Sequence, residues 1–173
     1  VNDAALRFGS SEYARTVLGS VWGLPPALDL DYERRVQACC RELARRGVIE
    51  SAHDSSDGGL AVALAEACFD GLGLEADLQS PLGPLLALFA EFSSQIVVSL
   101  AENRLEALAS IAAQYEVRAD VLGATQAQVV SLRVNGNPAG PGFVEEFRRP
   151  GEQALEAQLR SHVVAGCSRP EQR

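Results

Sequence analysis

The sequence predicts an α+β fold in which helices cover a mixed sheet. Three observations lead to this prediction. Residues 31–46 carry the clearest helical pattern, residues 95–100 carry the clearest strand pattern, and helix-like and strand-like segments intermix without a regular βαβ rhythm.

The chain has 173 residues, of which 47% are hydrophobic and 22% are charged. This length and composition indicate a single globular domain over residues 1–173 with a proper core.

The N-terminal part begins with a connecting segment, residues 1–28. Within it, residues 9–19 (GSSEYARTVLG) predict a short helix capped by Ser10 or Ser11, and the sequence from Trp22 to Pro26 predicts a rigid connector. The helix predicted over residues 31–46 follows. Asp29 or Asp31 can cap that helix, and Gly47 ends it. Its apolar stripe consists of Tyr32, Val36, Cys39 or Cys40, and Leu43.

A short strand over residues 48–52 is expected next, and then a helix over residues 58–69 that is apolar nearly all round and therefore buried. Further strands are predicted over residues 74–78, 95–100, 117–123 and 128–134, with an amphipathic helix over 102–115. Asn135-Gly136 is a turn signal. Pro138, Pro141 and Gly142 are expected to loosen the chain before a poorly defined tail, residues 140–173, that contains a last helix over about 152–164.

Composition excludes several classes of function. The net charge is −8, lysine is absent and the arginines form no basic stripe, so we expect no nucleic-acid partner. No apolar run reaches membrane-spanning length, so we expect no membrane partner. The four cysteines form no CxxC pair, which favours buried, reduced thiols in a cytoplasmic protein over a zinc site or disulfides. The absence of methionine and the start at Val1 lead us to expect a piece of a longer polypeptide.

The polar cluster HDSSDGG, residues 53–59, stands directly before the predicted buried helix. A helix N-terminus presents free N–H groups and partial positive charge, and Gly58 and Gly59 would let a phosphate approach them closely. The carboxylate of Asp54 is suited to hold a magnesium ion. Ser56 or Asp57 can equally be an ordinary helix cap, and His53 can be a satisfied core histidine, so chemistry alone leaves both interpretations open.

Several segments together resemble one family. The sequence HDSSDGGL, residues 53–60, is similar to the HDxSDGGL signature of the phosphoribosylformylglycinamidine synthases. The segment GSSEY, residues 9–13, resembles that family's GGSEY, the segment PPALDL, residues 25–30, resembles its PP-x-LDL, and the segment LFAE, residues 88–91, resembles its LF-x-E block. The resemblance runs from about residue 9 to residue 135.

The resemblance implies a function and a set of site residues. It implies the C-terminal domain of the synthetase subunit, with a fold resembling the C-terminal domain of aminoimidazole ribonucleotide synthetase. The family converts formylglycinamide ribonucleotide to formylglycinamidine ribonucleotide in purine biosynthesis, with ATP, Mg²⁺ and ammonia from a glutaminase subunit or domain. Carried over residue by residue, Asp54 is a magnesium ligand and Ser56 contacts the nucleotide. Gly58 and Gly59 are expected to belong to the same cofactor-binding site because they leave the backbone open to a phosphate.

The same resemblance implies that catalysis lies elsewhere. The family's catalytic histidine belongs to upstream synthetase domains that this chain lacks, so no catalytic residue is assigned here, and the isolated chain is expected to be inactive. The chain departs from the family at Gln95, where an arginine is usual. Two alternatives remain: a scaffold or interface domain with a vestigial nucleotide site, and a related enzyme such as a selenophosphate synthetase or a thiamine-monophosphate kinase.

The sequence also suggests the surroundings of two carboxylates, Glu66 and Glu91, and the position of an apolar contact face. Glu66 is expected to be a rim carboxylate or one paired with a partner. Glu91 is expected either to cap or contact an adjoining domain or to be plainly exposed. An apolar contact face for adjoining domains is expected near Val17, Leu18, Trp22 and residues 84–92.

Overall fold

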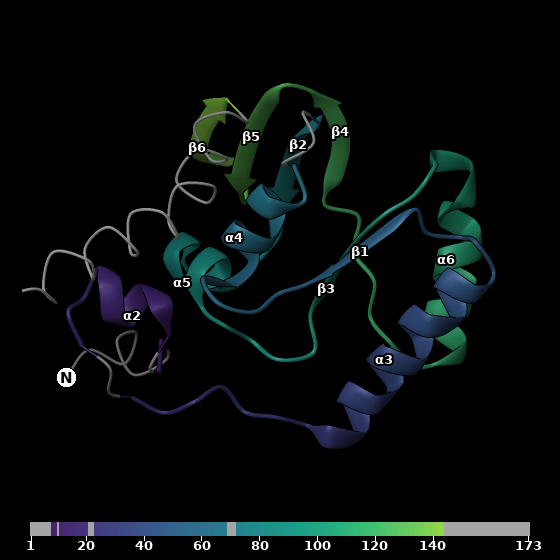
Figure 1. Cartoon of the computed structure of the whole chain (residues 1–173), viewed down its shortest axis with the longest axis horizontal. Coiled ribbons are helices and arrows are strands. Elements are labelled where there is room, and N and C mark those ends of the chain that lie inside the picture. The colour runs from purple at the N-terminus through teal and green to yellow at the C-terminus, as the bar shows by residue number, and fades with distance from the viewer. Residues whose placement is uncertain (1–7, 10, 21–22, 69–71, 144–173) are drawn as a thin grey trace, which may run out of the picture.

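The computed structural model of the chain describes residues 8–9, 11–20, 23–68 and 72–143. It has an α+β fold with helices on a mixed sheet, which confirms the predicted fold class (Figure 1). The elements in chain order are α2 (Glu12–Thr16), α3 (Leu30–Arg45), β1 (Ser51–Asp54), α4 (Gly59–Glu66), β2 (Leu72–Leu78), α5 (Pro84–Phe89), β3 (Ile96–Ser99), the 3₁₀ turn η1 (Glu102–Arg104), α6 (Leu105–Gln114), β4 (Gly123–Ala127), β5 (Val129–Val134) and β6 (Asn137–Phe143).

The strands form two sheets. Four of them lie in the order β4-β2-β5-β6, with β2 and β5 parallel and the two outer pairs antiparallel. The other sheet is a two-stranded antiparallel ribbon of β1 and β3, in which Asp54 lies opposite Ile96. Asn135 and Gly136 both take positive φ, +53° and +76°, and form the predicted tight turn between β5 and β6.

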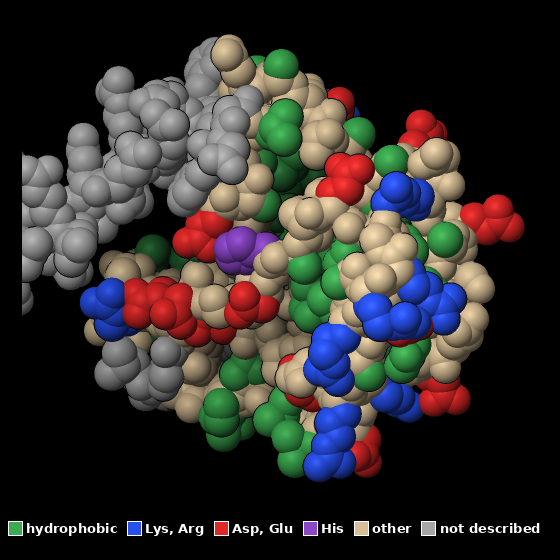
Figure 2. Space-filling view, turned by 45° about the vertical axis from the view of Figure 1, so that its right-hand side comes forward, with side chains coloured by type: hydrophobic (Ala, Val, Ile, Leu, Met, Phe, Trp, Pro, Cys, Tyr) green, Lys and Arg blue, Asp and Glu red, His purple; other side chains and the backbone are tan. Residues whose placement is uncertain are grey.

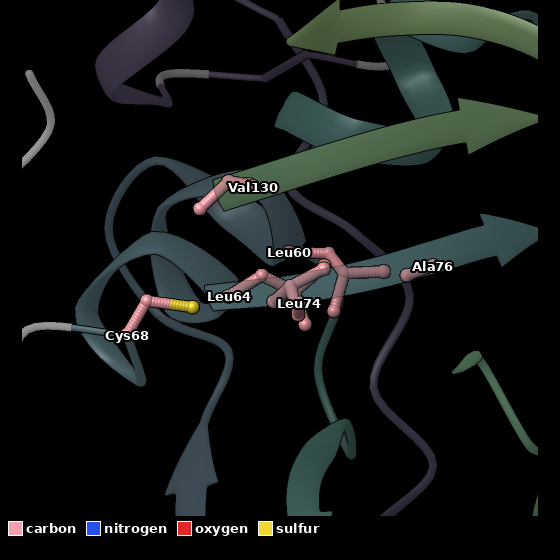
Figure 3. Close-up of a cluster of buried hydrophobic side chains, with 6 residues drawn as sticks. All are labelled: Leu60, Leu64, Cys68, Leu74, Ala76 and Val130. Carbon is pink, nitrogen blue, oxygen red and sulfur yellow. The ribbon is translucent and has the colours of Figure 1, made fainter. Parts of the chain in front are cut away.

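Helices α4 and α5 pack against the four-stranded sheet. Leu60 and Leu64 of α4 lie against Leu74 of β2 and Val130 of β5 (Figure 3). Ala87 and Leu88 of α5 pack with Val134 of β5 in a neighbouring cluster. Only one side of α4 is buried, however, and Glu66 at its end is exposed. The prediction that this helix is buried nearly all round is therefore wrong, because it covers a sheet from one side only.

Helices α3 and α6 pack together at the other end of the ribbon (Figure 1). Asp29 is the N-cap of α3, and its Oδ1 accepts the N–H groups of Asp31 and Tyr32, both at 3.0 Å. The buried stripe of α3 is Val36, Cys39 and Leu43, as predicted. These caps and contacts explain why the most regular part of the sequence forms the longest helix.

The end of α3 decides where β1 begins. Gly47 takes φ +64°, its N–H donates to Ala44, and the N–H of Val48 donates to Leu43. This is the Schellman arrangement, and its apolar contact buries Val48 beside Leu43. Since Val48 belongs to the helical core, the strand expected over residues 48–52 begins later, at Ser51. His53 and Asp54 are therefore strand residues and not part of a loop.

Two more local predictions are wrong. Residues 117–122 form no strand, because Val117 packs on the α3–α6 cluster, and only from Gly123 does the chain pair with β2. Pro138 and Pro141 do not loosen the chain. They lie in β6, an edge strand, where the missing N–H of proline is tolerated.

Some predictions fall outside the described residues, namely those on Ser10, Trp22, Cys167 and the helix over residues 152–164. Among the helices of the described ranges, none has the length and apolar character needed to cross a membrane.

Candidate functional site

The polar cluster HDSSDGG lies at the junction between β1 and α4 (Figure 1). His53 and Asp54 are the last residues of β1, and residues 55–58 form the turn that leads into the helix. The N–H of Ser55 donates to the carbonyl of Gln95 at 3.0 Å, so the residue before β3 holds the start of the turn. The hydroxyl of Ser55 is buried and has no hydrogen-bond partner within the described part of the chain.

The side chains proposed as ligands face solvent. Asp54, Ser56 and Asp57 are all exposed. A carboxylate oxygen can coordinate Mg²⁺, and a serine hydroxyl can donate a hydrogen bond to a phosphate oxygen. The chemistry of these side chains therefore fits a magnesium-nucleotide. Within the described ranges, no three His, Cys, Asp or Glu side chains are close enough to hold a metal ion together. Asp54 can therefore supply one ligand, and the others must come from the nucleotide, water or another domain.

Neither Ser56 nor Asp57 caps α4. The N-cap is Gly58, in the left-handed conformation with φ +82°, and no side chain of the cap residue bonds the first turn. The N–H of Gly59 donates instead to the carbonyl of Ser56 at 3.0 Å. The prediction of a Ser56 or Asp57 cap is wrong, and as a result both side chains remain available at the surface.

The local structure requires glycine at positions 58 and 59, whether or not a ligand binds there. A Cβ on Gly58 would lie 2.4 Å from Cγ2 of Val62, and one on Gly59 would lie 2.8 Å from the carbonyl oxygen of Ala90. Both residues also take positive φ, which glycine adopts at little cost. Gly58 and Gly59 are both buried, and the missing side chain of Gly59 lets the turn approach the end of α5, whereas that of Gly58 leaves room for Val62 of α4. Their assignment to cofactor binding stays a prediction.

Glu91 is the side chain whose role the sequence left undecided between a contact and plain exposure. Its Oε1 accepts the N–H of Gly58 at 2.8 Å and the N–H of Glu12 at 2.8 Å. Glu91 thus bonds two backbone amides of its own chain, a contact that the sequence did not predict, and the expected contact with an adjoining domain stays a prediction. The LFAE block before β3 was the available signal, but the two amides lie 33 and 79 residues away in sequence, beyond the reach of local cap rules.

Glu66 is paired with His53, as one of its alternatives predicted. Its Oε2 lies 3.2 Å from Nε2 of His53, and Nδ1 of His53 lies 2.7 Å from the carbonyl oxygen of Asp54. This pairing ties the end of β1 to the last turn of α4. His53 is half-buried and links these two elements.

Acidic side chains lie close to this junction on the face shown in Figure 2. Figure 2 shows acidic side chains on both sides of the histidine, while arginines gather at the far side of this face. Most of those arginines already have acidic partners on or near α3, such as Arg35 with Glu116 at 2.7 Å. A locally acidic surface suits a divalent cation better than a bare phosphate.

The described cysteines are not candidates for chemistry. Cys39 and Cys68 are buried, Cys40 is half-buried, and all three are free thiols. Burial raises the pKa of the Cys39 and Cys68 thiols, so both stay protonated and unreactive. The expectation of buried, reduced thiols holds for these residues.

Comparison with known sequences identifies relatives over most of the chain. A family model described as AIR synthase related protein, C-terminal domain, matches residues 4–135. The chain is 43% identical over 148 residues to the phosphoribosylformylglycinamidine synthase subunit PurL of Moorella thermoacetica, covering 85% of this chain and 20% of that protein. It is 41% identical over 152 residues to the same subunit of Salinibacter ruber, covering 86% and 20%. The chain thus spans about a fifth of the length of these relatives.

Comparison with solved structures finds the same fold. The structure of PurLQS from Thermotoga maritima matches with a TM-score of 0.67 and 16% identity, over 81% of this chain and 24% of that one. PurL of the same organism complexed with ATP matches with a TM-score of 0.65 and 18% identity, again over 81% and 24%. At these identities the similarity establishes a common fold.

Proposed function

Because the chain belongs to the family of AIR synthase related protein C-terminal domains, we propose that it is the C-terminal domain of a formylglycinamidine ribonucleotide synthase subunit. The observation that carries this proposal is the 43% identity to a named synthase subunit over 85% of the chain. The complete subunit would convert formylglycinamide ribonucleotide to formylglycinamidine ribonucleotide, with ATP as the activating cosubstrate. It would act as an ATP-dependent C–N ligase in purine biosynthesis.

The geometry of the turn supports a nucleotide role for this domain. Asp54 would hold Mg²⁺ and Ser56 would donate a hydrogen bond to a nucleotide phosphate, since both side chains are exposed at the end of β1. Gly58 and Gly59 would keep the turn free of side chains at the same place. The bound ion would neutralise phosphate charge, and the task of the chain is to orient the donors that hold it.

The remaining parts of the active site would lie outside this chain. The upstream synthetase domains would supply the substrate site and the catalytic groups, and a glutaminase subunit or domain would supply ammonia. The fold shared with PurLQS of Thermotoga maritima supports a role of this domain within a larger synthase. With one metal ligand on its own surface, the isolated chain would have no synthase activity.

The test is a comparison of the isolated chain with the complete subunit that carries it. In the presence of Mg²⁺, ATP, formylglycinamide ribonucleotide and ammonia, the complete subunit should form the amidine product, with ATP consumption that depends on the ribonucleotide. The isolated chain should consume no ATP. Turnover of ATP by the purified chain, or a complete subunit whose ATP use ignores the ribonucleotide, contradicts the proposal.

A second candidate is a scaffold domain with a vestigial nucleotide site. The observation in its favour is that the N–H of Gly58, the donor a phosphate would use, already bonds the carboxylate of Glu91. The exposed side chain of Gln95, where the family usually has arginine, points the same way. A complete subunit that makes product normally after Asp54→Asn and Ser56→Ala together would favour this scaffold role.

A further inference from the structure

Glu91 joins two segments that are distant in sequence. Its Oε1 accepts one hydrogen bond from the N–H of Glu12, at the start of α2, and one from the N–H of Gly58, at the start of α4. Both bonds are 2.8 Å long and part-buried. Hydrogen bonds from backbone amides to an ionised carboxylate are stronger than those between neutral groups, because the acceptor carries charge.

Close packing places Glu91 between these two amides. Gly59 allows the turn to approach the carbonyl groups of Leu88 and Ala90, since a Cβ at Gly59 would lie within 3 Å of both. On the other side, Phe8 and Ala14 form a buried cluster with Ala90. The rings of Phe8, Tyr13 and Phe89 are stacked beside it, with centroids 4.7 and 5.2 Å apart. The residue after Ala90 therefore meets both the N-terminal segment and the turn.

The turn is held at both of its ends by one short segment. Glu91 bonds the N–H of Gly58, and the carbonyl of Gln95 bonds the N–H of Ser55. Ser94, beside Gln95, is anchored in turn because its hydroxyl donates to Glu33 of α3 at 2.5 Å. Residues 91–95 thus form a clamp on residues 55–58. Ser56 is exposed on the clamped turn, and Asp54 is exposed as the last residue of β1, directly before it.

We propose that Glu91 is a positioning residue that fixes this turn and couples it to the N-terminal segment, residues 11–17. As far as nucleotide binding is concerned, the inference rests on the proposed function. If Glu91 has this role, its carboxylate is the anion that bonds the backbone at the start of α4. A nucleotide phosphate would then be held by Ser56 and by a magnesium ion for which Asp54 would be a ligand, and not by the N–H of Gly58.

The coupling is tested by hydrogen–deuterium exchange on the complete subunit, with wild type, Glu91→Ala, Glu91→Gln and the control Glu106→Ala. Glu106 is an exposed carboxylate on α6, far from the turn in sequence. In Glu91→Ala the amides of Glu12 and Gly58 should both exchange roughly tenfold faster or more, the scale of one lost bond to a charged group. Glu91→Gln keeps an acceptor oxygen and should restore part of the protection, and Glu106→Ala should change neither amide.

Magnesium-ATP titration of the same proteins tests positioning apart from simple stability. Glu91→Ala should weaken binding several-fold in protein that is still folded, with partial rescue by Glu91→Gln. Unchanged exchange at both amides in Glu91→Ala overturns the coupling. Faster exchange with unchanged affinity overturns the positioning role. If wild type itself fails to bind magnesium-ATP, the proposed function fails, while the exchange of the two amides still decides whether Glu91 couples the segments.

Discussion

At the scale of single residues, the structure distinguishes two serines that look alike in sequence. Ser11 is buried, and its Oγ accepts the N–H of Ala14 at 3.2 Å as the N-cap of α2. Ser56 stands before α4 but caps nothing. Ser11→Ala should therefore lower the free energy of unfolding by about 1 kcal/mol, the usual cost of a lost cap, while Ser56→Ala leaves it nearly unchanged. Urea unfolding of both variants checks this, and equal losses would contradict the assignment of the caps.

Gly59 is the residue of the signature that tolerates change least. A Cβ at this position would lie 2.8–3.0 Å from backbone atoms of residues 88–90, and its φ of +72° is unfavourable for any side chain. Gly59→Ala should cost about 1–3 kcal/mol of stability, the range for backbone strain of this kind. Gly136→Ala is the matched control, because Gly136 also has positive φ but nothing lies within 4 Å of its Cβ position. Thermal unfolding should show the larger loss for Gly59→Ala, and equal losses would mean that the close approach to α5 is unimportant.

At the scale of elements, the contact between α3 and the clamp segment depends on pH. Hydrogen bonds from the Ser94 hydroxyl and from Gln37 hold the pKa of Glu33 below its ordinary value of 4.5. A lowered folded pKa contributes stability that is present above the unfolded pKa and is lost as pH falls through the folded value. Ser94→Ala should raise the pKa of Glu33, with a stability loss that is largest near neutral pH and fades in acid. Carboxyl NMR titration checks the pKa, and an unchanged titration would contradict the contact.

The elements also show how far the sequence predicts the structure. Periodicity located α3, α6, β2 and β3, because each has a continuous apolar face or stripe. Periodicity failed where a residue of a predicted strand belongs to the end of the preceding helix. Val48 completes the C-terminal cap of α3, so β1 begins only at Ser51. The polar cluster was placed correctly at the start of a helix. The residue that caps this helix start was predicted wrongly. The carboxylate that bonds the N–H of Gly58 belongs to Glu91, 33 residues away in sequence, and local capping patterns span only a few residues.

At the scale of the whole molecule, several large apolar side chains of the N-terminal part and of α5 remain exposed, as do Leu72, Val121 and Val129 elsewhere. The expected contact face is partly present: Val17, Leu18 and Leu85 are 62%, 46% and 54% exposed, whereas Ala87 and Leu88 are buried in the core. The connector before α3 adds Leu24 and Leu28, and the first residue of α3 adds Leu30, all more than half exposed. Exposed apolar side chains at a surface predicted to meet other domains agree with such a contact. We expect that contact to be made by the upstream domains of the complete subunit.

Asp54, the last residue of β1, is proposed to bind a magnesium-nucleotide. The most direct measurement is titration of magnesium-ATP into the complete subunit with Asp54→Asn, beside Asp57→Asn as a control for charge in the adjoining turn. Both residues are exposed, so folding should survive in each case. Asp54→Asn should weaken binding about tenfold, or ~1.4 kcal/mol, because a neutral amide is a poorer ligand for Mg²⁺, and Asp57→Asn should change it little. Wild-type affinity in Asp54→Asn would contradict the account.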